Sequence, residues 1–172
     1  MENILKLHWL FLSAGFVVFL GSCKSTSAPE SVTFELNKTF EVHLPAGSPV
    51  DQDILSFVKI DIQDSDLTAH STSLSKITSV KLSTLNFLAF TVDPHERTPT
   101  PDYFIDSLRI LADPLSLAQF NTKSTTVTNA EFSSYVKNPN NQFFVHTFLQ
   151  HTPVYDVMAR FNYVLTIIAN TN

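Results

Sequence analysis

Apolar and polar residues alternate along two long segments, one near each end of the chain. In Tyr155–Ala169 every odd position is apolar, whereas Asp156 and Arg160 fall on the other side. In Val32–Leu44 most of the even positions are apolar. A period of two over such lengths is typical of a strand that packs one face on a core. Both segments are therefore predicted to be long strands.

Four further segments are interpreted as strands. Phe57–Ile62 alternates on the even positions, and Gln142–Leu149 is rich in aromatic and β-branched residues. The apolar positions of Ser79–Val92 change phase twice, which indicates a bulge or a strand buried on both faces. Tyr103–Ala112 fits both the helical and the strand period, and we interpret it as a strand.

Two segments have helical features. Ser65–Ile77 carries apolar residues at helical spacing, and Asp64 or Ser65 stands where a helix cap would lie. Thr128–Glu131 matches a capping box, in which a Thr and a Glu three residues later satisfy the first backbone N–H groups. Apolar residues at helical spacing follow it. A short helix is expected at each place.

Six or seven strands with one or two short helices predict a mainly β protein. The expected fold is a two-sheet antiparallel sandwich of the immunoglobulin-like or Greek-key kind, with phenylalanines pointing inward. The sequence contains neither Asn-Gly nor Asp-Gly, the dipeptides that favour two-residue hairpins. Turns are therefore expected to be made by Pro, Asn and Asp in longer loops, at Pro45–Asp53, Asp93–Asp102 and Asn138–Gln142.

The N-terminus has the features of a secretory signal peptide. A twelve-residue, largely apolar run, Trp9–Leu20, follows Lys6 and precedes the small residues Gly21 and Ser22. A membrane-spanning helix needs roughly 20 apolar residues, so the run is too short for one. An uncleaved membrane anchor remains the alternative.

Cys23 is the single cysteine of the chain, and it follows this run directly. Leu20-Gly21-Ser22-Cys23 resembles the lipobox of bacterial lipoproteins. The resemblance implies that the thiol of Cys23 receives a diacylglycerol and that Leu20, Gly21 and Ser22 are recognised by a dedicated peptidase. It also implies that the new amino terminus is acylated, for instance with palmitate. The alternative is a secreted protein whose cysteine falls here by accident.

The lipobox resemblance and the strand pattern together divide the chain into three parts. Residues 1–22 form the signal peptide, residues 23–31 a lipidated flexible tether, and residues 32–172 one β-sandwich domain. Lys24 stands where an aspartate would favour the inner membrane in Gram-negative lipoproteins, so the resemblance implies the outer membrane. No acidic cluster of the kind that directs Bacteroidota lipoproteins outward follows Cys23, which favours the periplasmic side over the cell surface.

The chain also resembles the small β-sandwich lipoproteins of Bacteroidota. The resembling segments are Leu85–Val92, Ser107–Leu111, Glu131–Asn138 and the alternating last strand. The similarity is one of pattern over most of residues 30–170. Many such proteins have no assigned activity, so the resemblance carries over no catalytic residue.

Charge and motifs restrict the function classes. The net charge is −5 and no basic cluster is present, which argues against a nucleic-acid partner. No nucleophile elbow, phosphate loop, zinc-ligand spacing or paired-carboxylate motif occurs, so we predict no enzyme, no cofactor and no metal. The six histidines are scattered. The acidic run Asp61, Asp64 and Asp66 fits helix capping and solubility better than calcium binding.

Two features suggest contact with sugars. Asp106-Ser107-Leu108 resembles the acceptor motif for O-glycosylation of exported Bacteroidota proteins, which makes Ser107 a candidate glycosylation site. The pairs Tyr103–Phe104 and Phe143–Phe144 each put one ring on either face of a strand. The outward ring either stacks on a sugar at an exposed surface or is covered by a helix or loop.

The expected function is a lipid-anchored, non-catalytic binding or assembly module with a protein or glycan partner. Asp93–Asp102 is the first candidate for the contact, because its three prolines lower the ordering cost of binding. Those prolines could instead blunt a sheet edge. An enzyme or metal-dependent protein would bring histidines and carboxylates into one cleft. A subunit of a surface appendage would need a detachable strand at Val32–Leu44.

Overall fold

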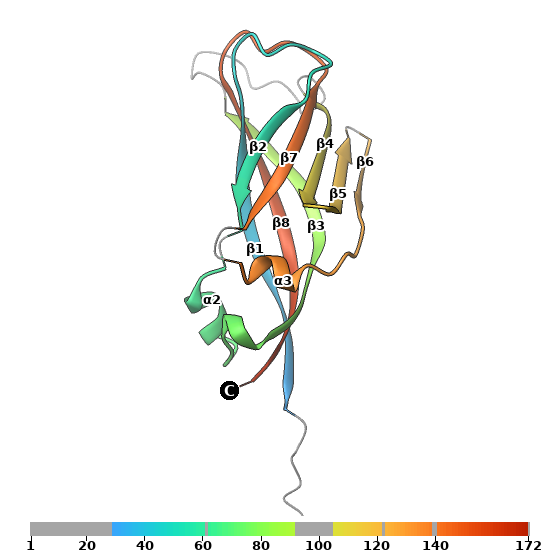
Figure 1. Ribbon diagram of the computed structural model, residues 1–172. Coiled ribbons are helices and arrows are strands. Elements are labelled where there is room, and N and C mark those ends of the chain that lie inside the picture. The colour runs from blue at the N-terminus through green and yellow to red at the C-terminus, as the bar shows by residue number, and fades with distance from the viewer. Residues whose placement is uncertain (1–28, 61, 92–104, 122, 139–140, 172) are drawn as a thin grey trace, which may run out of the picture. The chain divides into compact units, whose positions relative to one another are not determined.

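The computed structural model describes residues 29–60, 62–91, 105–121, 123–138 and 141–171. Its elements belong to one compact unit, Ser31–Asn172. In chain order they are β1 Ser31–Leu44, β2 Ile54–Lys59, α2 Asp64–Thr68, η1 Leu74–Lys76 (a 3₁₀ turn), β3 Ile77–Thr91, β4 Ile105–Ala112, β5 Leu115–Asn121, β6 Ser124–Val127, α3 Ser133–Val136, β7 Gln142–Leu149 and β8 Val157–Asn170 (Figure 1). The strands form two antiparallel sheets, β1-β8-β3 and β2-β7-β4-β5-β6. The prediction of a mainly β, two-sheet sandwich with short helices is confirmed.

The three-stranded sheet is built from the longest strands, with β8 in the centre. β1 pairs with β8 over its full length, from Ser31 opposite Asn170 to Leu44 opposite Val157. All the odd positions of β8 are buried, and the even positions of β1 point inward, as the alternation predicts. This continuous pairing of β1 disfavours its exchange between molecules.

The five-stranded sheet contains a Greek key. β4, β5 and β6 follow one another as antiparallel neighbours, and the chain then returns through α3 to place β7 beside β4. The spatial order β7-β4-β5-β6 is the four-strand Greek-key arrangement. β2 pairs with β7 and forms one edge of this sheet. The strand begins at Ile54, three residues before the predicted start, and keeps the predicted phase.

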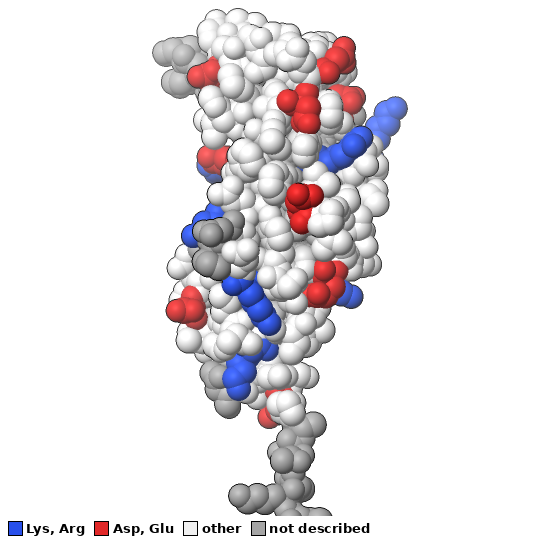
Figure 2. All heavy atoms as spheres, in the orientation of Figure 1, with Lys and Arg blue, Asp and Glu red and all other residues white. Residues whose placement is uncertain are grey.

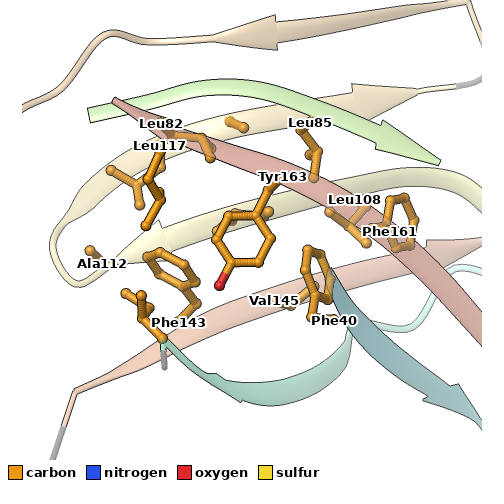
Figure 3. Packing of buried hydrophobic residues seen from close by; sticks show 14 of the residues in the cluster. Phe40, Leu82, Leu85, Leu108, Ala112, Leu117, Phe143, Val145, Phe161 and Tyr163 are labelled. Carbon is orange, nitrogen blue, oxygen red and sulfur yellow. The ribbon is translucent and has the colours of Figure 1, made fainter. Parts of the chain in front are cut away.

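The core lies between the two sheets and is rich in phenylalanine. Phe161 of β8 is fully buried, and its ring centre lies 5.3 Å from that of Phe40 and 5.5 Å from those of Phe87 and Phe120. Tyr163 packs beside this group, between residues from both sheets (Figure 3). Because the chain has only one cysteine, no intrachain disulfide links the sheets, and burial of these side chains is the main stabilising term.

β3 is irregular where its apolar pattern changes phase. Its register against β8 shifts between Ile77 and Ser79, between Leu82 and Thr84, and between Phe87 and Ala89. Leu82, Leu85 and Phe90 therefore all point inward although their spacing breaks the period of two. Leu88, at the third shift, is half exposed. Of the two interpretations of this pattern, the bulge is confirmed, because the outward positions of β3 include exposed residues and its register shifts.

The helical segment after β2 is shorter than its apolar spacing predicts. α2 and η1 are separate, and Ser71 between them has a left-handed φ of 54°. The cap is Gln63, so the prediction of Asp64 or Ser65 is wrong, because both residues already lie in the first turn. Asp66 Oδ2 accepts a hydrogen bond from the Gln63 backbone N–H at 2.8 Å.

Asp66 also ties α2 to β1. Lys38 occupies an inward position of β1, and its Nζ lies 2.5 Å from Asp66 Oδ2. Partial burial raises the pKa of Asp66. The hydrogen bonds from Lys38 and from the Gln63 N–H, with the charge of Lys38, outweigh that effect and lower the pKa below 3.8. The capping interpretation of the acidic run is thus confirmed for Asp66, whereas Asp61 lies outside the described residues.

The predicted short helix after Glu131 is present as α3, but its predicted capping box is wrong. Phe132 is the cap residue, and Thr128 Oγ1 instead donates to backbone carbonyls of β5. Glu131 Oε1 accepts hydrogen bonds from the backbone N–H groups of Ser133 (2.6 Å) and Val80 (3.1 Å). The Glu131 side chain therefore connects α3 to β3, a role that local sequence does not reveal.

The same contacts set the pKa of Glu131. Partial burial raises this pKa, but the hydrogen bonds from Ser133 and Val80 and the charge of Lys137 lower it below 4.5. The ionised carboxylate is thus the form that the native contacts favour.

Two strands, β5 and β6, were not predicted, and the described chain contains eight strands instead of six or seven. β4 and β5 are joined by Asp113 and Pro114 alone, through a cis peptide bond. At the next turn, Asn121 Oδ1 accepts hydrogen bonds from the backbone N–H groups of Lys123 and Ser124. The expectation that proline and asparagine make the turns is confirmed at these two places, but both turns are tight, so the expected longer loops are wrong there.

Candidate functional site

The outer faces of the two sheets differ in composition. The outward positions of β1, β3 and β8, all of which are described, carry no Phe, Tyr or Trp. The outward positions of β2 and β7 carry Phe57, Phe144 and Phe148. Adjacent apolar groups that remain accessible on a folded domain commonly mark an interaction site. The outer face of the five-stranded sheet around these three rings is called the aromatic face below.

Phe57 and Phe144 form the exposed part of the aromatic face. They lie directly opposite each other on β2 and β7, with ring centres 5.4 Å apart and an edge-to-face angle of 70°. Phe57 is 57% exposed, and Phe144 is half-buried. Its neighbour Phe143 is buried in the core, so the prediction that the Phe143–Phe144 pair divides between the two faces is confirmed.

Polar groups with planar ends lie next to these rings. Arg109 of β4 is the register partner of His146 on β7 and of Gln119 on β5. The Arg109 Cζ atom lies 5.9 Å from the centre of the Phe148 ring, within the range of a cation–π contact. His146 Nδ1 lies 2.6 Å from Asp53 Oδ2. Aromatic and hydrogen-bonding groups therefore alternate along the outward positions of β7, in the order Phe144, His146 and Phe148.

An open hollow of about 490 Å³ lies beside Arg109 and Phe148. Its lining also includes Asp51, Asp106 and Ser107. A second hollow of about 320 Å³ shares Asp106 and Ser107 and continues over β5. Both volumes lie within the range of small-molecule sites, roughly 300–1,000 Å³.

A bulge in β4 places Asp106 and Ser107 at these hollows. The register against β7 shifts between Ile105 and Ser107, which leaves Asp106 as the extra residue. Bulges of this kind re-aim side chains and are common beside functional sites. Ser107 is half-buried and lies opposite Phe148 and Asn121. Glycosylation of Ser107 stays a prediction. The Ser107 residue itself lines both hollows.

Two loops at the upper end of the sheets in Figure 1 are joined to each other. The Gly47 N–H donates to the Pro153 carbonyl at 2.8 Å, and Gly47 adopts a positive φ of 77° that favours glycine. Val154 and Tyr155 are exposed there. This end lies opposite Ser31, the first residue of β1, and a strand of that length spans about 45 Å.

Several predicted site residues lie outside the described part of the chain. They are Leu20, Gly21, Ser22 and Cys23 of the lipobox, the Asp93–Asp102 loop, and the rings of Tyr103 and Phe104. Among the residues that are described, no helix has the length and apolar character needed to cross a membrane.

Three of the four described histidines each contact a different residue. His43 is 3.7 Å from Asp156, His70 stacks on Phe34 with ring centres 3.9 Å apart, and His146 pairs with Asp53 on the aromatic face. Over the described ranges, no three His, Cys, Asp or Glu side chains form a group that could hold a metal ion.

Charged residues are interspersed on the face seen in Figure 2, where Asp and Glu lie between Lys and Arg. The larger hollow also has charges of both signs, because Asp51 and Asp106 line it together with Arg109. A strongly charged ligand of either sign would therefore meet repulsion as well as attraction in the hollow.

Sequence reasoning missed Phe57, Phe148 and Arg109. Phe57 falls between the apolar even positions of its strand, which is the signal that it points outward. No pattern in the sequence brings Arg109 near Phe148, because that contact depends on the pairing of β4 with β7.

Comparison with protein-family models, with curated proteins and with solved structures finds no match for this chain.

Proposed function

We propose that the chain is a lipid-anchored, non-catalytic binding module of the cell envelope whose ligand surface is the aromatic face. One observation carries the proposal. The outward rings are concentrated on one sheet, beside two hollows lined with hydrogen-bonding groups, whereas the other sheet presents no Phe, Tyr or Trp. A difference of this kind between two faces of one sandwich supports a specific contact on one of them.

The proposed anchor is the acylated Cys23. Its support is the Leu20-Gly21-Ser22-Cys23 sequence at the end of a short apolar run. Two or three acyl chains would give durable attachment, whereas a single chain holds only marginally. Lys24 and the absence of an acidic cluster after Cys23 favour the outer membrane and its periplasmic side. The tether would enter the domain at Ser31, at the opposite end of β1 from the exposed loops.

A face-specific photo-crosslinking experiment tests the proposal. A photoreactive benzoylphenylalanine is placed at Gln119, exposed on the five-stranded sheet, and in a matched protein at Thr39, exposed on the three-stranded sheet. Irradiation of intact cells should give a defined adduct from the first position only. Adducts confined to the Thr39 position would refute the proposed surface.

The same experiment separates the binding module from the appendage subunit. A ladder of adducts of the chain with itself would favour an assembly subunit. β1 pairs fully with β8, so strand exchange through β1 has no support in the fold.

A further inference from the structure

We infer that the aromatic face binds an uncharged oligosaccharide, with one sugar ring on Phe57 and another in the hollow beside Arg109 and Phe148. The inference rests on the proposed function, since it names the ligand class of the same surface. Its support is that the exposed ring of Phe57 and the larger, polar hollow lie on the same outer face of one sheet.

The exposed ring matches one face of a sugar. A pyranose presents C–H groups on its faces and hydroxyl groups around its edge, so an aromatic ring complements the apolar face. Phe57 is more than half exposed, and its edge-to-face contact with Phe144 restrains its orientation. Little side-chain freedom is then left to lose when a ligand stacks on it.

The hollow supplies the partners that the hydroxyl groups require. Each hydroxyl both donates and accepts hydrogen bonds, so its site needs groups of both kinds. The carboxylates of Asp51 and Asp106 accept, and the guanidinium of Arg109 donates. The contact of Arg109 with Phe148 orients that guanidinium, whose donors form a rigid planar fork.

The distance between the two parts favours an oligosaccharide over a single sugar. Phe144, which contacts Phe57, and Phe148, which lines the hollow, are four residues apart on β7. Four residues of an antiparallel strand span about 13 Å, which is longer than one sugar ring. A ligand that touches both must therefore be an extended chain that follows β7.

Charge and hydration argue for an uncharged, hydroxyl-rich ligand. Two carboxylates and one guanidinium line the larger hollow, and the whole chain carries −5, so acidic glycans would meet net repulsion despite the attraction of Arg109. An apolar peptide would cover Asp106 and Arg109 without offering either side chain a partner, and burying unpaired charges is costly. Sugar hydroxyl groups pair with these side chains and leave them partly hydrated.

Binding of neutral oligosaccharides to the full-length chain in detergent tests the inference. The probes are oligomers of glucose, mannose and N-acetylglucosamine, together with oligomers of glucuronic acid. Phe57→Ala and Arg109→Lys should each weaken the binding measured by calorimetry about tenfold, which corresponds to about 1.4 kcal/mol. The matched controls are Leu88→Ala and Arg160→Lys, which change an exposed leucine and an exposed arginine on the other sheet. Both controls should bind as the wild type does.

The outcomes separate the inference from the proposed function. Photo-crosslinked adducts at Gln119, together with no binding of neutral oligosaccharides at millimolar concentration, would support the proposed binding function and refute the inferred sugar ligand. Preference for glucuronic acid oligomers, or equal losses in the controls, would overturn it as well. A sugar-sized mass increment on Ser107 without binding of free sugar would also overturn the inference. A dimer of the chain that Phe57→Ala converts to a monomer would overturn it too.

Discussion

Thr147 is a polar residue in an apolar part of the core. It lies on the inward face of β7, where its register partners are Ile54 and Leu108, and it is fully buried. Its Oγ1 has no hydrogen-bond partner within the described chain. Valine has nearly the same shape and carries a methyl group in place of the hydroxyl. We therefore expect Thr147→Val to stabilise the protein.

The magnitude follows from the burial. A buried polar group without a partner costs about 1–3 kcal/mol, and the substitution removes this penalty without changing the packing volume. The free energy of unfolding should rise by about 1–3 kcal/mol. For a unit of this size, each kcal/mol raises Tm by about 3–4 °C.

The assay is urea unfolding followed by circular dichroism, with calorimetry for Tm. Thr72→Val is the matched control, since Thr72 is equally buried but its Oγ1 donates to the Asn170 carbonyl at 2.7 Å. This control should lose about 0.5–1.5 kcal/mol. If Thr147→Val is destabilised as much as Thr72→Val, the Thr147 hydroxyl has a partner and the reasoning is refuted.

Three further predictions concern the tie to α3, acid stability and the anchor. Glu131→Ala should lower the free energy of unfolding by about 1.5–3 kcal/mol in urea titrations, because it removes a charged acceptor from two backbone N–H groups, and Glu131→Gln should lose less. The pKa values of Asp66 and Glu131 are lowered in the native state, so the unfolded chain binds more protons in acid. This stability should therefore be fully present above the ordinary pKa values of 3.8 and 4.5 and be lost as pH falls below them, through the lowered native pKa values. Asp66→Asn should flatten this loss in urea titrations at a series of pH values. Cys23→Ala should release the protein from the membrane fraction, and an unchanged distribution with Met1 still present by mass spectrometry would contradict the anchor.

The long strands and the bulges of β3 could be predicted because their signals are local. Every odd residue of Tyr155–Ala169 is apolar, and the phase changes of Ser79–Val92 coincide with register shifts. β5 and β6 were missed because they are short and follow tight turns at Pro114 and Asn121, where longer loops were expected. The predicted capping box at Thr128 is wrong for another reason. The Thr128 side chain donates to a carbonyl of β5, and the Glu131 side chain accepts from the Val80 N–H of β3.

The candidate site could be predicted only in part. The adjacent residues Phe143 and Phe144 must point to opposite faces of a strand, so an outward ring follows from sequence alone. The position of Arg109 beside Phe148 depends on which strands pair, and their separation along the chain carries no signal of it.

The most direct test of the ligand surface is a map of backbone amide shifts by NMR. The isotope-labelled full-length chain is titrated with the neutral oligosaccharide that binds best. Ligand binding on the aromatic face should shift the signals of Phe57, Ser107–Arg109 and Phe144–Phe148 and leave those of β1 and of the outer positions of β8 unchanged. Shifts confined to β1 and β8 would contradict it.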